Sequence, residues 1–160
     1  MNKILYFIFC LFFVFKAISL EIECKFEEVY SDGSMQQGLF LLKEQRLRYQ
    51  YFDKNLYTIF KKKDNFYLVN NRDLESFQKI PEEQTVLLDK ITKIANDYPN
   101  IKNYYQSDQI QITLEKSENN FFKRIAIVSD ELSMSIYINN CEQKKIEERL
   151  FSFFPFYQYP

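Results

Sequence analysis

Three pairs of adjacent glutamates are the side chains whose type and spacing come nearest to catalytic chemistry: Glu27-Glu28, Glu82-Glu83 and Glu147-Glu148. Two carboxylates can act as general acid and general base when their surroundings separate their pKa values. Neighbouring residues of a strand point to opposite faces, so Glu27 and Glu28 would not meet one substrate. Glu82-Glu83 suits the first turn of a helix, and Glu147-Glu148 follows Lys144-Lys145 in an expected turn. The pattern predicts no catalytic site and no enzyme.

Histidine is absent from the chain, which has three cysteines. Its absence removes Ser–His and Cys–His nucleophile pairs, imidazole bases and the commonest metal ligand. Only Cys24 and Cys141 remain once the N-terminal segment described next is removed, and two thiols without a histidine cannot build an ordinary zinc site. We therefore expect neither a metal centre nor a cofactor.

The first nineteen residues have the pattern of a secretory signal peptide. Lys3 precedes the uncharged apolar run Ile4–Phe15, and Ala17-Ile18-Ser19 offers the small residues that signal peptidase recognises. The run is shorter than the roughly 18–20 residues that a membrane-spanning helix needs; an uncleaved N-terminal anchor is the alternative. We expect residues 1–19 to be a signal peptide, residues 20–160 to form a single domain, and the protein to be exported.

An oxidising compartment favours a disulfide between Cys24 and Cys141. In the chain-entropy model, closing so long a loop stabilises the fold by about 4–5 kcal/mol. The bond would hold the first strand beside a late one. Two unpaired thiols are the alternative.

Charge and aromatic content narrow the class of partner. Without residues 1–19 the chain holds 19 basic and 22 acidic residues, a net charge of −3. This balance gives no electrostatic footprint for nucleic acid, and Lys61-Lys62-Lys63 is typical of a solvated hairpin tip. Seventeen Phe and twelve Tyr make up 18% of the chain, more than packing alone requires. The composition indicates an aromatic interior and no nucleic-acid partner.

From residue 21 onward, apolar and polar residues alternate with a period of two, which predicts strands with one solvent-facing side. Between residues 82 and 96 the apolar spacing becomes that of a helix, which Tyr98-Pro99 ends. The sequence thus predicts one antiparallel sheet of about eight to ten strands with a single inserted helix. The expected strands lie near residues 21–27, 38–42, 46–51, 56–60, 66–69, 72–80, 110–114, 121–129 and 134–138, followed by a last segment at 150–154.

A sheet with one apolar face and a lone covering helix can be built in two ways. The aromatic side chains either line a cavity for an apolar ligand or fill a solid core. Patterning alone leaves both possibilities open.

Several segments follow one another along the chain in an order typical of a known family. The strand Ile22–Phe26 and the turn Ser31–Ser34 precede Gly38–Lys43, whose Gly, alternating apolar residues and final Lys match one family strand. The later segments are, in order, Arg46–Tyr51, Asp64–Val69, the helix around Val86–Leu88, Asn139-Asn140, Ile146 and Leu150–Pro155. In this order the chain resembles the periplasmic outer-membrane lipoprotein carrier family over nearly all of residues 20–160.

That resemblance implies a mainly β fold, an incomplete antiparallel β-barrel (a half-barrel) with a short helical lid over an apolar cavity. It also implies a function without covalent chemistry. The cavity would shield the acyl chains of a lipoprotein cargo, taken from an inner-membrane exporter and passed to an outer-membrane receptor. Each buried methylene contributes about 0.8 kcal/mol, so acyl chains need such shielding in water. The residues expected to line the cavity are Phe40, Leu42, Leu47, Tyr49, Tyr51, Tyr67, Val69, Leu87, Leu88 and Ile91.

Two departures mark the chain as a divergent member of such a family. Glu44-Gln45 occupy the positions of a family Arg-Pro pair whose arginine holds the lid to the barrel. The first expected strand also begins almost directly after the expected cleavage site, where the family has an amphipathic helix. The alternative function is therefore a divergent lipid-binding domain, or a domain that binds another envelope protein with the same half-barrel.

Overall fold

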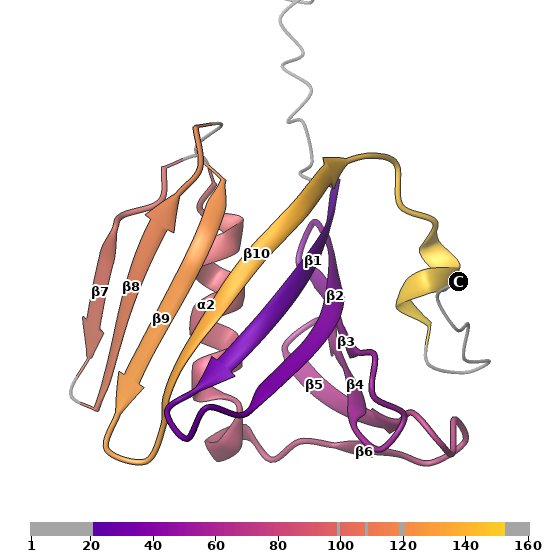
Figure 1. Cartoon of the computed structure of the whole chain (residues 1–160). Helices are drawn as coiled ribbons and strands as arrows, with labels where there is room; N and C mark the ends of the chain where they lie inside the picture. Colours follow the sequence, from indigo (N-terminus) through magenta and orange to yellow (C-terminus); the bar gives the residue numbers. More distant parts are fainter. Residues whose placement is uncertain (1–20, 99, 108, 119–120, 153–160) are drawn as a thin grey trace, which may run out of the picture.

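The computed structural model describes residues 21–98, 100–107, 109–118 and 121–152. The expected signal peptide at residues 1–19 and the expected terminal residues 153–155 lie outside this part of the chain. The described residues form one antiparallel sheet and one α-helix, as expected (Figure 1). The strands are β1 (Glu21–Tyr30), β2 (Met35–Lys43), β3 (Arg46–Tyr51), β4 (Tyr57–Lys62), β5 (Asn65–Asn70), β6 (Phe77–Lys79), β7 (Tyr104–Ser107), β8 (Ile110–Lys116), β9 (Phe122–Ser129) and β10 (Ser133–Gln143), the helix is α2 (Val86–Asn96), and 3₁₀ turns lie at Glu82–Gln84 and Glu148–Phe151.

Two meanders build the sheet, in the strand order β6-β5-β4-β3-β2-β1-β10-β9-β8-β7. The first and last strands of the chain, β1 and β10, pair and join the two meanders at the centre. The edge strands β6 and β7 do not pair with each other, so the barrel stays open, and the connection between them contains α2. Seen as in Figure 1, α2 lies behind the curved sheet and covers its concave face. The half-barrel with a short helical lid is therefore confirmed.

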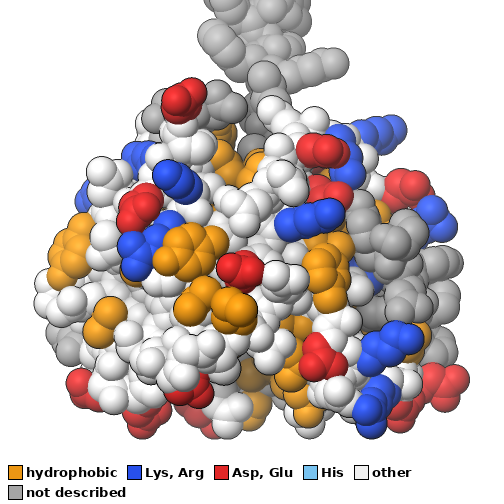
Figure 2. Space-filling model, viewed as in Figure 1, with side chains coloured by type: hydrophobic (Ala, Val, Ile, Leu, Met, Phe, Trp, Pro, Cys, Tyr) orange, Lys and Arg blue, Asp and Glu red, His pale blue; other side chains and the backbone are white. Residues whose placement is uncertain are grey.

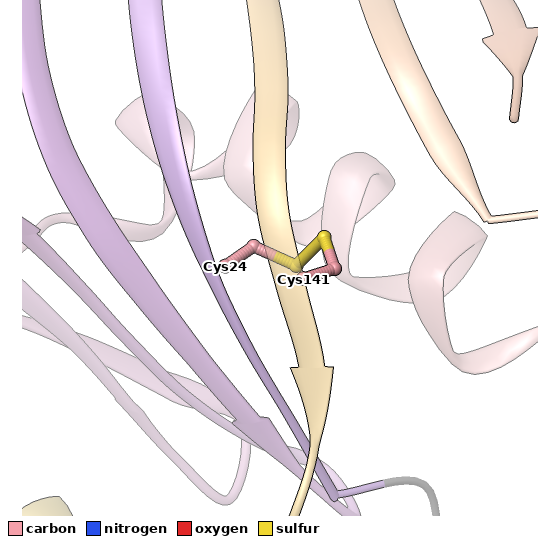
Figure 3. Close-up of a disulfide and its surroundings, with 2 residues drawn as sticks. All are labelled: Cys24 and Cys141. Carbon is pink, nitrogen blue, oxygen red and sulfur yellow. A yellow bond between two sulfur atoms is a disulfide. The ribbon is translucent and has the colours of Figure 1, made fainter.

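The disulfide lies at an irregularity in the central strand pair. Strand β1 pairs with β10 at Glu23–Glu142 and Lys25–Asn139, so β10 carries an extra residue opposite Cys24. Such a bulge turns a side chain that regular pleating would direct elsewhere. Here it brings the Cα of Cys141 to 4.1 Å from that of Cys24, and the two sulfurs are bonded (Figure 3). The bond ties the first strand to the last one.

The outer face of the sheet is bare at one end and covered at the other. On β8, buried Ile112 and Leu114 alternate with exposed Gln111 and Thr113, so one side faces solvent. Figure 2 shows charged side chains of both signs spread over the outer face seen there, with smaller hydrophobic groups between them. On β2, in contrast, every residue from Gly38 to Lys43 is buried.

The C-terminal segment covers the outer face of β2 and β3. Ile146 and Phe151 pack on Leu39 and Leu41, the outward residues of β2. Arg48 beside them is fully buried, and its guanidinium donates hydrogen bonds to the Leu150 carbonyl at 3.0 Å and to Gln50. The segment expected at 150–154 is thus a 3₁₀ turn at Glu148–Phe151 that packs on the outside of the barrel.

Other element boundaries also differ from expectation. The strand expected at 72–80 is only β6, because the Asn70 side chain accepts hydrogen bonds from the backbone N–H groups of Arg72 and Asp73 and starts a turn there. The helix expected from residue 82 begins at Val86, since Thr85 closes a tight turn onto the Glu82 carbonyl. Strand β7 was not predicted at all.

Candidate functional site

A cavity of about 270 Å³ lies between α2 and the concave face of the sheet. The lining strands contribute alternate side chains that point into the cavity, and α2 lines it with the side that faces the sheet. The cavity walls are almost wholly apolar, with Glu28 as the one ionisable carboxylate among them. The lining residues are Glu28, Tyr30, Phe40, Leu42, Leu47, Tyr49, Tyr51, Ile59, Leu87, Leu88, Ile91, Thr92, Ala95, Phe122, Ile125, Ile127, Leu132, Met134, Ile136 and Ile138.

Eight of the ten residues expected to line the cavity do so. Residues of β2 and β3 form one wall, and Leu87, Leu88 and Ile91 of α2 close the opposite wall. The eight are Phe40, Leu42, Leu47, Tyr49, Tyr51, Leu87, Leu88 and Ile91.

The prediction is wrong for Tyr67 and Val69, which face the outside of the half-barrel. Ile59 lines the cavity, and its partner across β4 and β5 is Leu68. Because side chains alternate along a strand, Tyr67 and Val69 on either side of Leu68 must point the other way. Val69 is nevertheless fully buried, on that outer face.

The wall contributed by β9 and β10 was missed. Met134, Ile136 and Ile138 point inward from β10, and Ile125 and Ile127 from β9. Part of their signal was present in the sequence, since Met134, Ile136 and Ile138 alternate with Ser135 and Tyr137. Residues 125–128 of β9, in contrast, form an unbroken apolar run that gives no face. What the sequence could not indicate is that β10 lies beside β1, which places both meanders around one cavity.

Glu28 is the most unusual residue of the site. Its side chain lies on the inner face of β1 and the residue is only 3% exposed. The Tyr49 hydroxyl donates to Oε1 at 2.7 Å, the Tyr30 hydroxyl to Oε2 at 2.7 Å, and the Tyr51 hydroxyl lies 3.0 Å from Oε2 and 3.2 Å from Oε1. No Lys or Arg nitrogen of the described residues forms an ion pair with it within 4.0 Å. We call Glu28, Tyr30, Tyr49 and Tyr51 the Glu28 cluster.

The tyrosines of this cluster keep their protons well into the alkaline range. Burial raises the pKa of Tyr30 to about 12, and its hydrogen bond to Glu28 adds to the shift. Burial first, and the charge of Glu28 second, also raise the pKa of Tyr49 and Tyr51 well above the ordinary value. All three hydroxyls are therefore available as hydrogen-bond donors at neutral pH.

The cluster lies where the cavity meets the surface. A second hollow opens between β4, β5 and the β1–β2 turn, and it is lined by Leu56, Tyr57 and Leu68 among others. Tyr30, Tyr51 and Ile59 line both the cavity and this hollow. Tyr30 and Tyr51 thus lie between the apolar interior and an opening to solvent.

Two polar contacts attach α2 to the sheet. Lys61 of β4 is buried, and its Nζ lies 2.9 Å from Oδ1 of Asp89 on the helix. Lys93 pairs with the same carboxylate at 2.6 Å, one helical turn further on. Hydrogen bonds from Lys93 and Lys61 hold the pKa of Asp89 below its usual value. On the other side of the helix, the Lys90 ammonium donates to the Ser107 hydroxyl of β7.

The carboxylate pairs singled out in the sequence do not share a site. Glu27 accepts a hydrogen bond from Gln37 at 2.7 Å on the outer face, whereas Glu28 points inward. Glu147 pairs with Arg149 and Glu148 with Lys43 and Arg46. The described residues contain no group of three or more His, Cys, Asp or Glu side chains that could hold a metal ion.

Within the described part of the chain, α2 is the one α-helix, and it is too short and too polar to cross a membrane. The site is thus an apolar cavity with the Glu28 cluster in its wall, an arrangement suited to binding. A scan against models of known protein families finds no match to this chain, and a search of the curated proteins finds no similar sequence.

Proposed function

We propose that this protein is a periplasmic carrier that shields the acyl chains of a lipoprotein or lipid in the cavity between α2 and the sheet. The observation that supports this best is the cavity itself, whose walls are apolar except at the Glu28 cluster and Thr92. A domain that needed only a stable core would fill this space with its own side chains, because protein interiors are close-packed. The open volume therefore favours a ligand.

The energetics suit an alkyl chain. Burying about ten methylenes at about 0.8 kcal/mol each gives ~8 kcal/mol. That free energy corresponds to a micromolar Kd before the cost of association is subtracted. A transient carrier needs affinity of this order, since it must also release its cargo.

The cavity volume limits what fits without movement. Ligand sites usually enclose about 300–1,000 Å³, and this cavity of about 270 Å³ lies just below that range. One alkyl chain is the natural occupant of such a space. A lipoprotein with several chains requires α2 to move outward, so the two polar contacts of α2 with the sheet become the control points of loading.

Through the family resemblance, the proposed carrier function also implies two partner proteins. Cargo would come from an inner-membrane exporter and pass to an outer-membrane receptor. Acyl chains are transferred without any covalent step. The direction of transfer is therefore set by the relative affinities of exporter, carrier and receptor for these chains. No cofactor is required at any stage of this proposal.

A native mass spectrum tests the proposal directly. The chain is expressed with its own signal sequence and purified from the periplasm without detergent. A mass excess that resolves into a lipoprotein or phospholipid is the expected result. A clean ligand-free mass that persists when lipoproteins are supplied in excess would refute the carrier function.

The same outcome would favour a second candidate, a domain that binds another envelope protein. The observation behind it is that β6 and β7, among the described residues, each pair with a single strand. A sheet edge can accept a strand from a partner. Co-purification of one envelope protein in a fixed ratio, with no lipid, is the result that this candidate predicts.

A further inference from the structure

An acyl-chain cavity needs no buried carboxylate, yet Glu28 is buried in the wall of this one. Burying a charge is costly unless a counterion accompanies it. Here three phenol hydroxyls solvate the carboxylate, but hydroxyl dipoles do not neutralise it. On the neighbouring strand β10, Glu28 pairs with Ile136. An apolar residue at position 28 would extend the apolar wall without the cost of burying a charge. Such a local conflict between sequence and burial points to a functional site.

Two of the tyrosines that bind Glu28 belong to a group of packed aromatic rings. Phe26 and Tyr49 stack with their centroids 4.0 Å apart. Tyr51 lies edge-on to both, at 5.7 Å from Phe26 and 5.6 Å from Tyr49. Ring faces attract cations, and a carboxylate beside aromatic rings is the combination that recognises organic ammonium groups. The tyrosine hydroxyls also hold Glu28 in place, so the acceptor is oriented before a ligand arrives.

The position of the cluster fits the geometry of an amphiphile. Two of its tyrosines, Tyr30 and Tyr51, line both the apolar cavity and the hollow that opens to solvent. A ligand whose alkyl chain fills the cavity therefore places its polar head at Glu28. An anionic head would meet an uncompensated negative charge there, whereas a cationic head would supply the missing counterion.

We propose that the Glu28 cluster is a head-group subsite that selects amphiphiles with a cationic amine over neutral or anionic ones of the same chain length. This inference rests on the proposed function, because it assumes that alkyl chains enter the cavity. The ammonium donates hydrogen bonds to the Glu28 carboxylate and lies against the neighbouring rings. Fatty acids are rejected at this site by charge.

Three probes with the same alkyl chain test the selection: dodecylamine, dodecanol and laurate. Binding is measured by titration calorimetry near neutral pH, below the concentration at which each probe forms micelles. A charge-assisted contact in a desolvated site is expected to make dodecylamine bind about tenfold or more tightly than dodecanol. Laurate is expected to bind most weakly. Equal affinities, or laurate in first place, would overturn the inference while leaving the cavity function intact.

Glu28→Gln keeps the shape of the side chain and removes its charge. In this variant the ratio of dodecylamine affinity to dodecanol affinity should fall from about tenfold or more to within about twofold. Glu27→Gln is the matched control, because it removes the same charge from the adjacent residue on the outer face. A preference for the amine that survives Glu28→Gln would overturn the inference. If Glu28→Gln does not fold, the order in which the unaltered protein binds the three probes is enough to support or overturn the inference.

The failure of the proposed function is recognised separately. If none of the three probes binds, the cavity does not take alkyl chains, and both proposals are overturned. A further arm identifies the source of the amine, using vesicles of phosphatidylethanolamine and phosphatidylglycerol in equal amounts. Enrichment of phosphatidylethanolamine on the protein supports the subsite with a membrane lipid as its ligand, and enrichment of phosphatidylglycerol would contradict it.

Discussion

Lys61 of β4 and Asp89 of α2 form an ion pair with 2.9 Å between Nζ and Oδ1, which joins the wall of the half-barrel to its lid. The Lys61 side chain is only 8% exposed, and the Asp89 side chain is 34% exposed. The Lys61 ammonium also lies 5.1 Å from the centroid of the Phe66 ring. This pair joins the lid to the sheet at positions other than Glu44-Gln45. Glu44 is exposed in the β2–β3 turn.

Asp89→Asn should loosen the lid. The substitution preserves the shape of the side chain but leaves the buried Lys61 ammonium without its counterion. We expect the free energy of unfolding to fall by about 1–2 kcal/mol, less than for a fully buried pair because Asp89 is partly exposed. Release of a bound apolar dye, followed by stopped-flow fluorescence, should become faster.

Lys93→Met is the control for this variant. Lys93 pairs with the same carboxylate but is 73% exposed and lies on the helix itself. Its removal should change stability by less than about 0.5 kcal/mol and leave the release rate unchanged. Equal effects of Asp89→Asn and Lys93→Met would show that the contact to the sheet is not what holds the lid.

The inward faces of β2 and β3 could be predicted from the sequence, whereas that of β5 could not. In β3, Leu47, Tyr49 and Tyr51 alternate with polar residues. In β5, four consecutive residues are apolar, so the pattern gives no face, and a shift of one position exchanges the two sides. Leu68 points inward there, in place of the predicted Tyr67 and Val69.

The Glu28 cluster was not predictable for a different reason. The sequence presents Glu28 only as one of two adjacent glutamates, and Tyr49 and Tyr51 as alternating residues of a distant strand. They meet because β1 and β3 both pair with β2, in registers that no local pattern specifies. The contact between the two meanders is likewise a property of the β1–β10 pairing, so the far wall of the cavity was missed.

The pairing of Cys24 with Cys141 predicts that reduction destabilises the protein. Cys141 is exposed, so a reductant can reach the bond, while Cys24 is fully buried. The double variant Cys24→Ala/Cys141→Ala should lose about 2–5 kcal/mol in urea unfolding. The intact protein should gain the mass of two hydrogens on reduction. An unchanged mass, or equal stability with and without reductant, would contradict the bond.

Alkaline pH should destabilise the fold through the tyrosines of the Glu28 cluster. The pKa of Tyr30 is about 12 in the folded protein against an ordinary value of 10.0. The unfolded chain therefore loses this proton first as the pH rises. Stability is fully present below pH 10 and falls as the pH rises toward about 12. Urea midpoints across this interval measure the fall, which Tyr30→Phe should reduce; a midpoint independent of pH would contradict the pKa shift.

Gly38→Ala should be among the most damaging single substitutions. A Cβ at this position would overlap the Gln50 carbonyl oxygen and the Phe26 ring. Backbone and a packed aromatic ring must both move, so we expect a loss of about 3 kcal/mol or more. Gly33→Ala is the control: its Cβ would meet open space, and only the positive φ of 84° costs energy, about 1 kcal/mol. Thermal unfolding of the two variants should rank them in this order.

Leu87→Glu tests whether the cavity is the binding site. Leu87 lines the cavity from α2, so the new carboxylate would enter an apolar space that alkyl chains must occupy. Burying a charge there costs more than a chain gains from its contact with Leu87, and binding of a neutral apolar dye should weaken by well over about tenfold. Because Leu87 is only half-buried and belongs to the lid, the sheet should still fold, as far-UV circular dichroism can verify.

Val86→Glu adds the same charge one residue earlier, where the side chain is 48% exposed and is not part of the cavity wall. A dye that binds Val86→Glu normally and fails to bind Leu87→Glu has entered between helix and sheet. A dye that binds both variants equally well occupies some other surface, and the carrier function would then lose its site.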